Sequence, residues 1–231
     1  MSQVLEKIKN KIIISVQAMP NEPLYDEVCI NALIKSVING GAAGLRVAGP
    51  RDVKNAKRLT DVPVIGITKP SKIPANYKEL VYITPTIEDA KSIIEAGADI
   101  VAFDATARKR AANENLSQLI DFIHSKGRLA MADISTFEEG VMNSLLGADI
   151  ISTTLSGYTT YSETNSTEPD FKLVKKLAKT INTPIILEGR IWEPIEVEKA
   201  FKSGAFSVVI GSAVTRPQLI TKRFVKALPQ K

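Results

Sequence analysis

Short apolar runs alternate with amphipathic segments along the whole chain. The apolar runs cover residues 12–18, 44–47, 64–69, 81–84, 100–106, 129–134, 150–154, 185–189 and 208–212. Their apolar residues follow one another without alternation, which is typical of strands covered on both faces in a parallel sheet. Helical patterns lie between them, for example at 88–96, 116–125, 137–146, 171–180 and 194–203. Several of these patterns end in a Gly-Ala pair, where glycine permits the left-handed turn that precedes the next strand. The alternation therefore predicts stacked βα units.

The nine apolar runs are one more than an eightfold barrel needs. The segment between the third and fourth runs, residues 70–80, contains two prolines and is too short for the helix that must connect two parallel strands. We therefore assign residues 81–84 to the loop after the third strand. The prediction is an α/β fold, a single (β/α)8 TIM barrel domain over residues 1–231, with residues 1–11 as an N-terminal helical lead-in. A doubly wound open sheet is the alternative, but no glycine-rich fingerprint follows the first run.

Composition and charge narrow the classes of function. The chain has 30 Lys and Arg against 25 Asp and Glu, with the charges scattered and only 6% aromatic residues, so no nucleic acid is expected as a partner. No run approaches the roughly 18 apolar residues of a membrane span, so no membrane is expected either. The single cysteine, Cys29, favours a cytoplasmic location. The single histidine, His124, cannot build a histidine-rich metal site, and we expect no metal and no cofactor.

Polar residues end almost every predicted strand. They are Gln17, Arg46, Lys69, Asp104, Asp133, Thr153 with Thr154, Glu188 and Ser212. In (β/α)8 barrels the carboxyl ends of the strands form the active-site mouth, so these side chains should converge there. Gln17 and Arg46 are open to a role inside the barrel, and Asp104 and Asp133 to a role in supporting loops. Lys69 and Glu188 are the strongest candidates for chemistry.

Glycines after the seventh and eighth strands indicate a phosphate site. Glu-Gly-Arg at 188–190 follows the seventh strand, and Gly-Ser-Ala-Val-Thr-Arg-Pro at 211–217 follows the eighth. Backbone N–H groups at these positions commonly hold a phosphate in such barrels, and a nearby arginine adds a charge-assisted contact. The predicted phosphate-binding residues are Gly189, Arg190, Gly211, Ser212 and Arg216. Tight turns without a ligand are the alternative.

Eight short motifs run in order along nearly the whole chain. They are Ser-Val-Gln-Ala at 15–18, Gly-Leu-Arg at 44–46, Val-Ile-Gly-Ile-Thr-Lys at 64–69, Phe-Asp-Ala-Thr at 103–106, Met-Ala-Asp-Ile at 131–134, Ser-Thr-Thr-Leu-Ser-Gly-Tyr-Thr at 152–159, and the two glycine motifs above. This series resembles that of the N-acylglucosamine-6-phosphate 2-epimerases. Members of that family interconvert N-acetylmannosamine 6-phosphate and N-acetylglucosamine 6-phosphate in the breakdown of sialic acid (N-acetylneuraminate).

The resemblance implies a role for each matching residue. Lys69 is similar to the family's catalytic lysine and Glu188 to its partner carboxylate. The positions similar to sugar-contacting residues are Gln17, Arg46, Asp133 and Thr154. Pro70 departs from the pattern, since many members have an arginine after the lysine. Relatives are usually homodimers, and Phe-Val-Lys-Ala-Leu at 224–228 is a candidate surface for a second copy.

The residue types fit this chemistry. Inverting C2 of the open-chain sugar requires a base that removes the proton next to the aldehyde. A lysine in a partly desolvated mouth beside Arg46 should have its pKa lowered, so that a fraction is free amine. We expect Lys69 to exchange the C2 proton, Glu188 to position or relay through a substrate hydroxyl, and Arg46 to stabilise the enolate oxygen.

Rival functions are open to test. Lys69 could instead form a Schiff base, as in an aldolase-type lyase that acts on a sugar phosphate. A metal-dependent pentose phosphate epimerase needs more histidines than this chain has. A regulator that only binds phosphosugars should have lost the pair of Lys69 and Glu188, and both residues are present.

Overall fold

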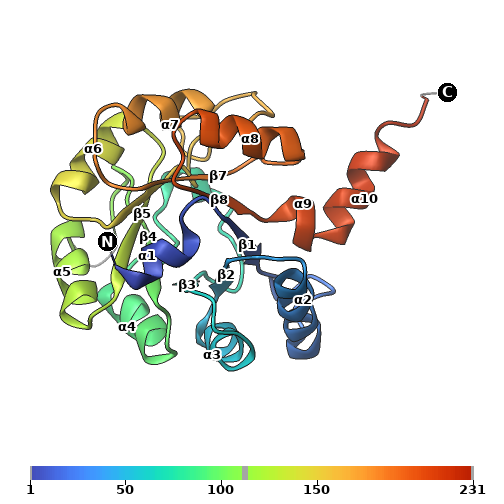
Figure 1. Cartoon of the computed structure of the whole chain (residues 1–231), viewed down its shortest axis with the longest axis horizontal. Helices are drawn as coiled ribbons and strands as arrows, with labels where there is room; N and C mark the ends of the chain where they lie inside the picture. Colours follow the sequence, from blue (N-terminus) through green and yellow to red (C-terminus); the bar gives the residue numbers. More distant parts are fainter. Residues whose placement is uncertain (1, 111–113, 230–231) are drawn as a thin grey trace.

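The structure, a computed structural model, describes residues 2–110 and 114–229. Eight parallel strands pair in sequence order, and β1 also pairs with β8, which closes the barrel. The strands are β1 (Ile12–Val16), β2 (Gly44–Ala48), β3 (Val64–Ile67), β4 (Ile100–Asp104), β5 (Leu129–Asp133), β6 (Ile150–Ser152), β7 (Ile185–Glu188) and β8 (Ser207–Ile210). The predicted (β/α)8 barrel is confirmed, with the strands at the centre of Figure 1 and helices around them.

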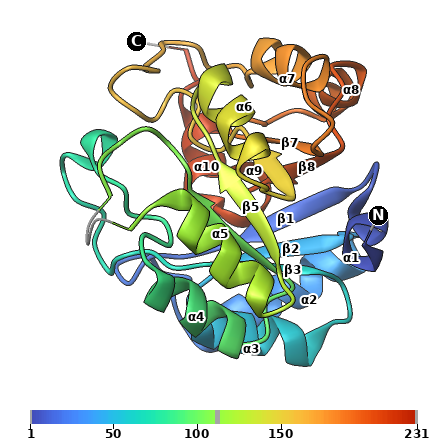
Figure 2. The same cartoon turned by 90° about the vertical axis from the view of Figure 1, so that its left-hand side faces the viewer.

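Helices between consecutive strands cover the outside of the barrel, as the side view in Figure 2 also shows. These are α2 (Glu27–Asn39), α3 (Pro50–Leu59), α4 (Ile87–Glu95), α5 (Leu116–Ser125), α6 (Phe137–Leu145), α7 (Phe171–Ala178) and α8 (Pro194–Lys202). In addition, α1 (Gln3–Ile8) precedes β1, and α9 (Ser212–Thr215) and α10 (Pro217–Val225) follow β8. Gly97, Gly147 and Gly204 follow α4, α6 and α8 with φ between 96° and 101°. Their left-handed backbone confirms the predicted glycine turns at the helix ends.

Residues 81–84 form no strand, as predicted. They lie in the connection between β3 and α4, which also contains the short 3-10 helix η1 (Tyr77–Glu79). Two arginines from the loop after β4 hold this connection by its carbonyl groups. Arg108 Nη1 donates to Tyr77 O at 2.8 Å, and Arg110 Nη2 donates to Pro85 O at 2.8 Å. The connection is therefore fastened against the rim of the barrel rather than inserted into its sheet.

Alternate residues of each strand point into the barrel, as the pleat of a strand requires. The buried inner layer contains Ile13, Ile65, Ile67, Ile100, Ala102, Met131, Ile150, Ile186 and Val209, with Leu5 and Ile8 of α1 packed on it. A second, larger apolar layer lies between the strands and the outer helices. Because Leu5 and Ile8 belong to the inner layer, α1 packs on the end of the barrel where the strands begin.

The chain leaves the barrel after α9, which is held to β1 by the hydrogen bond from Thr215 Oγ1 to Ser15 O. Figure 1 shows α10 extending to one side of the molecule. None of the residues of α10 is buried, and Phe224, Val225 and Leu228 are 73%, 57% and 65% exposed. The last helix thus presents apolar side chains to solvent instead of packing them against this chain.

Candidate active site

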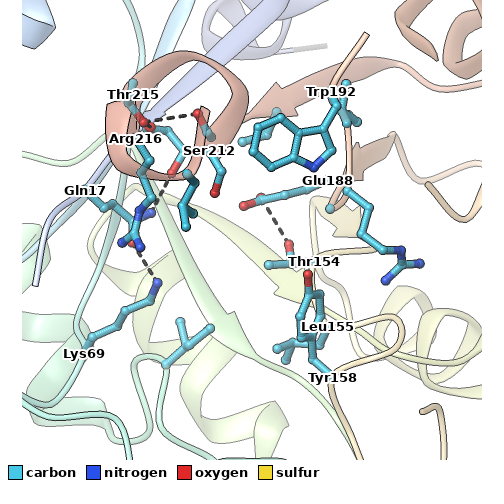
Figure 3. A pocket seen from close by; sticks show the side chains of 18 of the residues that line it. Gln17, Lys69, Thr154, Leu155, Tyr158, Glu188, Trp192, Ser212, Thr215 and Arg216 are labelled. Carbon is cyan, nitrogen blue, oxygen red and sulfur yellow. Dashed lines mark hydrogen bonds between the residues drawn. The ribbon is translucent and has the colours of Figure 1, made fainter. Parts of the chain in front are cut away.

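A cavity of about 480 Å³ opens at the carboxyl-terminal mouth of the barrel. Its lining includes Gln17, Lys69, Thr154, Glu188, Gly189, Arg190, Gly211, Ser212 and Arg216. The pleat explains the convergence, because these positions continue the inward alternation of the inner layer. Lys69 follows Ile65 and Ile67 at two-residue intervals, and Glu188 follows Ile186. Figure 3 shows Lys69, Glu188, Thr154 and Arg216 around the same space.

Lys69 lies just after β3 and is half-buried beside two arginines and two carboxylates. Its Nζ donates to Gln17 Oε1 at 2.7 Å, and Gln17 Nε2 donates to Ser15 Oγ at 2.8 Å. Burial and the positive charges of Arg46 and Arg216 lower the pKa of Lys69 to about 8, while Glu188 and Asp133 oppose the shift. A lysine with this pKa has an appreciable fraction of neutral amine near pH 7, as a general base requires.

Arg46 lies beneath the cavity rather than in its lining. The side chain is only 1% exposed, and its two terminal nitrogens bind both oxygens of Asp133 and, at 2.8 Å, Glu188 Oε2. Burial opposes its charge, but the two carboxylates raise the pKa of Arg46 above its ordinary value. Asp133 is fully buried and also lies outside the lining. Both sugar-contact candidates therefore form the floor under the cavity.

Glu188 and Asp133 share hydrogen-bond donors in this floor. Thr154 Oγ1 lies 2.7 Å from Asp133 Oδ1 and 3.1 Å from Glu188 Oε2, and its one hydroxyl hydrogen serves one carboxylate at a time. Burial first, and the neighbouring Asp133 charge, raise the pKa of Glu188 against the opposing effect of Arg46. Glu188 is thus a carboxylate that takes up a proton more readily than an ordinary glutamate.

The predicted phosphate residues meet on the β7–β8 side of the cavity. Gly189 has a φ of 113°, a conformation that favours glycine, and Gly211 precedes Ser212 at the start of α9. Arg216 Nη1 donates to Glu22 Oε1 at 2.7 Å. Arg190 lines the cavity, but its guanidinium donates to the carbonyls of Glu168 and Ser156. The guanidinium of Arg190 therefore makes more hydrogen bonds to the protein than that of Arg216 does.

Asp104 lies away from the cavity. It is fully buried, pairs with Arg108 and accepts hydrogen bonds from Thr106. Burial raises the pKa of Asp104 to about 6, against the effect of Arg108. The structure therefore favours loop support, one of the two roles that the sequence left open, because Arg108 in turn binds the connection after β3.

Sequence reasoning missed the apolar wall of the cavity. Tyr82, Leu155, Tyr158 and Trp192 line it together with the polar residues. Tyr82 belongs to residues 81–84, in the connection between β3 and α4. Burial raises the pKa of its hydroxyl to about 12. Leu155 and Tyr158 lie within the motif at 152–159, and Tyr82 within an apolar run, but neither pattern indicates a cavity wall. Their position depends on how three separate loops fold over the mouth.

Among residues 2–110 and 114–229, no group of three or more His, Cys, Asp or Glu side chains is arranged to hold a metal ion. In that part of the chain no helix is both long and apolar enough to cross a membrane.

The fold and site define a class of protein: a (β/α)8 barrel whose carboxyl-terminal mouth gathers a lysine, a glutamate and two arginines around one cavity. The family model described as N-acetylmannosamine-6-phosphate epimerase matches residues 30–230. A related protein from Clostridium perfringens, named N-acetylmannosamine-6-phosphate 2-epimerase, is 46% identical over 226 residues. The match covers 97% of this chain and 100% of the related protein. A relative of the same name from Clostridioides difficile is 43% identical, covering 97% of this chain and 99% of its own.

A solved structure agrees with these sequence matches. The N-acetylmannosamine-6-phosphate 2-epimerase from Clostridium perfringens superposes with a TM-score of 0.92 at 44% identity, covering 98% of this chain and 97% of the other. The chain therefore belongs to the N-acetylmannosamine-6-phosphate epimerase family.

Proposed function

We propose that this enzyme interconverts N-acetylmannosamine 6-phosphate and N-acetylglucosamine 6-phosphate by exchanging the proton on C2, and that it serves the breakdown of sialic acid. The family supports the substrate pair. The observation that carries the mechanism is Lys69, whose pKa of about 8 makes it a base in a cavity that it shares with Glu188. Organic cofactors and metals have no step to perform in this mechanism.

The reaction needs one proton to leave C2 and one to return on the opposite face. With a pKa of about 8, roughly a tenth of Lys69 is neutral amine at pH 7 and can take the C2 proton of the open-chain sugar. The electron pair moves onto the aldehyde oxygen as an enolate. A proton then returns to the other face of C2 and gives the epimer, either from Glu188 through a sugar hydroxyl or, where Glu188 only positions the sugar, from the Lys69 ammonium. In the first case Lys69 gives its proton back to Glu188 or to water, so that both groups regain their starting protonation.

The role of Arg46 differs from the direct contact with the sugar that the sequence predicts. Because Asp133 and Glu188 occupy its terminal nitrogens beneath the cavity, we propose that its charge acts through space. It lowers the pKa of Lys69 and favours the negative charge of the enolate. Thr154 and Gln17 then complete the polar surroundings of the sugar from the cavity wall.

The phosphate belongs on the side of the cavity formed by Gly189, Gly211, Ser212 and Arg216. Glycines there let the backbone approach phosphate oxygens, and Arg216 supplies a positive charge. Arg190 also lines the cavity, but its contacts with Ser156 and Glu168 hold the loop after β6. We propose that its contribution to phosphate binding is weaker than that of Arg216.

Proton NMR in heavy water tests this function. The wild-type enzyme should convert N-acetylmannosamine 6-phosphate to its epimer and incorporate deuterium at C2. Lys69→Ala should lose both exchange and epimerisation, whereas Lys72→Ala, at an exposed lysine of the same loop, should retain both. Retention of C2 exchange by Lys69→Ala would exclude the lysine as the base. Borohydride added during turnover should leave Lys69 unlabelled, because the lyase alternative alone forms a Schiff base.

We also propose that the enzyme is a cytoplasmic homodimer. A phosphorylated sugar substrate and a chain with one cysteine suit the reducing interior of the cell. The exposed Phe224, Val225 and Leu228 of the projecting C-terminal segment supply apolar surface for a second copy. Sedimentation velocity should give about twice the mass of the chain, and charged substitutions at Phe224 and Leu228 should shift it toward the monomer.

A further inference from the structure

An ion pair joins the two ends of the barrel sequence at the mouth. Glu22 lies in the loop between β1 and α2, and Arg216 lies between α9 and α10, 194 residues later. Glu22 Oε1 accepts from Arg216 Nη1 at 2.7 Å and from Gln218 Nε2 at 3.3 Å. Its other oxygen accepts from the backbone N–H of Met19 at 2.8 Å. Both oxygens of the carboxylate are therefore occupied, and the glutamate is held from its own loop.

The position of Arg216 gives this ion pair a consequence for the site. Figure 3 shows the Arg216 side chain reaching into the cavity beside Gln17 and Lys69. The side chains of Arg216 and Glu22 are only 26% and 18% exposed, so the pair is better shielded from solvent than an ordinary surface pair. Glu22 itself is absent from the cavity lining. It contacts the guanidinium from outside, which leaves the other N–H groups of Arg216 for a ligand in the cavity.

We propose that Glu22 is a positioning residue that holds the guanidinium of Arg216 in the orientation that receives the phosphate of the substrate. The inference rests on the proposed function, since it takes Arg216 as a phosphate ligand. An arginine side chain has many rotamers, and a ligand that must freeze them loses affinity. A carboxylate anchored to Met19 removes that loss in advance, because it fixes Arg216 before the phosphate arrives.

Steady-state kinetics of Glu22→Ala test the proposal. We expect KM for N-acetylmannosamine 6-phosphate and the inhibition constant of inorganic phosphate each to rise about tenfold, with kcat within about twofold of wild type. Glu22→Gln, which keeps an acceptor oxygen but loses the charge, should give an intermediate increase. Glu198→Ala, at an exposed glutamate paired with Lys202 on α8, is the matched control and should leave all three constants unchanged.

A double-mutant cycle with Arg216→Ala separates positioning from a general effect on the loop. In the Arg216→Ala background, Glu22→Ala should change KM and the phosphate inhibition constant by less than about twofold, because the arginine to be positioned is gone. An unchanged or lower KM in Glu22→Ala alone, or an equal increase in both backgrounds, would overturn the proposal. Thermal unfolding of each variant confirms that folded enzyme is compared.

The same cycle distinguishes failure of this inference from failure of the phosphate assignment. If Arg216→Ala weakens phosphate inhibition while Glu22→Ala does not, Glu22 has no positioning role and the phosphate site stands. If Arg216→Ala leaves KM and phosphate inhibition unchanged, the assignment of Arg216 to the phosphate is wrong, and this inference falls with it.

Discussion

Replacing Lys69 by methionine should stabilise the protein while abolishing its activity. Burial and neighbouring cations lower the pKa of Lys69 from 10.5 to about 8, so keeping the ammonium in the mouth costs about 3 kcal/mol at pH 7. Methionine is similar in shape to the aliphatic part of lysine, carries no charge and removes this cost. It also removes the hydrogen bond to Gln17, which contributes about 1 kcal/mol. The variant should therefore be more stable than wild type by about 2 kcal/mol.

The direction of the pH dependence follows from the lowered pKa. Below pH 8 Lys69 is charged in both the folded and the unfolded chain, so the full cost is present. Between pH 8 and 10.5 the folded state releases the proton while the unfolded state keeps it, and the wild type gains stability as pH rises. Above this window both states are neutral, and the advantage of methionine has disappeared.

Urea unfolding at several pH values between 7 and 10 measures this difference, with the fluorescence of the single tryptophan, Trp192, as the signal. Lys72→Met, at an exposed lysine, is the control and should stay within about 0.5 kcal/mol of wild type. The reasoning is refuted if Lys69→Met is no more stable than wild type at pH 7. It is equally refuted if the difference between the two proteins does not shrink as pH rises.

The remaining predictions concern the pH profile, the floor and the packing of the barrel. The kcat/KM of the wild type should rise along a limb with an apparent pKa near 8, separate from the substrate phosphate near about 6; a profile flat from pH 7 to 9 contradicts Lys69 as the base. Asp133→Ala, which breaks a fully buried pair with Arg46, should lower the free energy of unfolding by about 3–5 kcal/mol in urea titrations, and a loss under about 1 kcal/mol contradicts this. Gly66→Ala should cost at least about 1–3 kcal/mol by the same measurement, since the added Cβ would lie 2.2 Å from Ile93 Cγ2; wild-type stability would mean that α4 moves aside without loss.

The barrel itself was readable from sequence because its signals are local. Unalternating apolar runs, helix-ending glycines and the length of each connection are properties of neighbouring residues. They also located the cavity residues Lys69 and Glu188, since a strand's carboxyl end is visible in sequence and all eight ends meet at one mouth. Even the exclusion of residues 81–84 needed only the observation that the preceding segment is too short for a helix.

The depth of each side chain at the mouth was not readable in this way. The sequence places Arg46 and Lys69 alike at strand ends, yet Arg46 lies in the middle of β2 and Lys69 just after β3. Asp133 and Glu188 seal Arg46 under the cavity, while Lys69 lines it. The difference depends on strand register and on which carboxylates lie opposite, and these partners are 87 and 142 residues away in the chain. A pattern of neighbouring residues carries no information on such distances.

The sequence by itself determined the order of the elements, the fold class and the residue types available at the mouth, because backbone preferences and apolar periodicity act over a few residues. Only the tertiary structure decided which polar groups face the cavity, which pair beneath it and which loops supply its apolar wall. It alone brought Glu22 to Arg216 and Tyr82 to the cavity. The physical reason is that hydrogen bonds, desolvation and charge–charge interactions depend on distances in space, which are set only when the barrel closes.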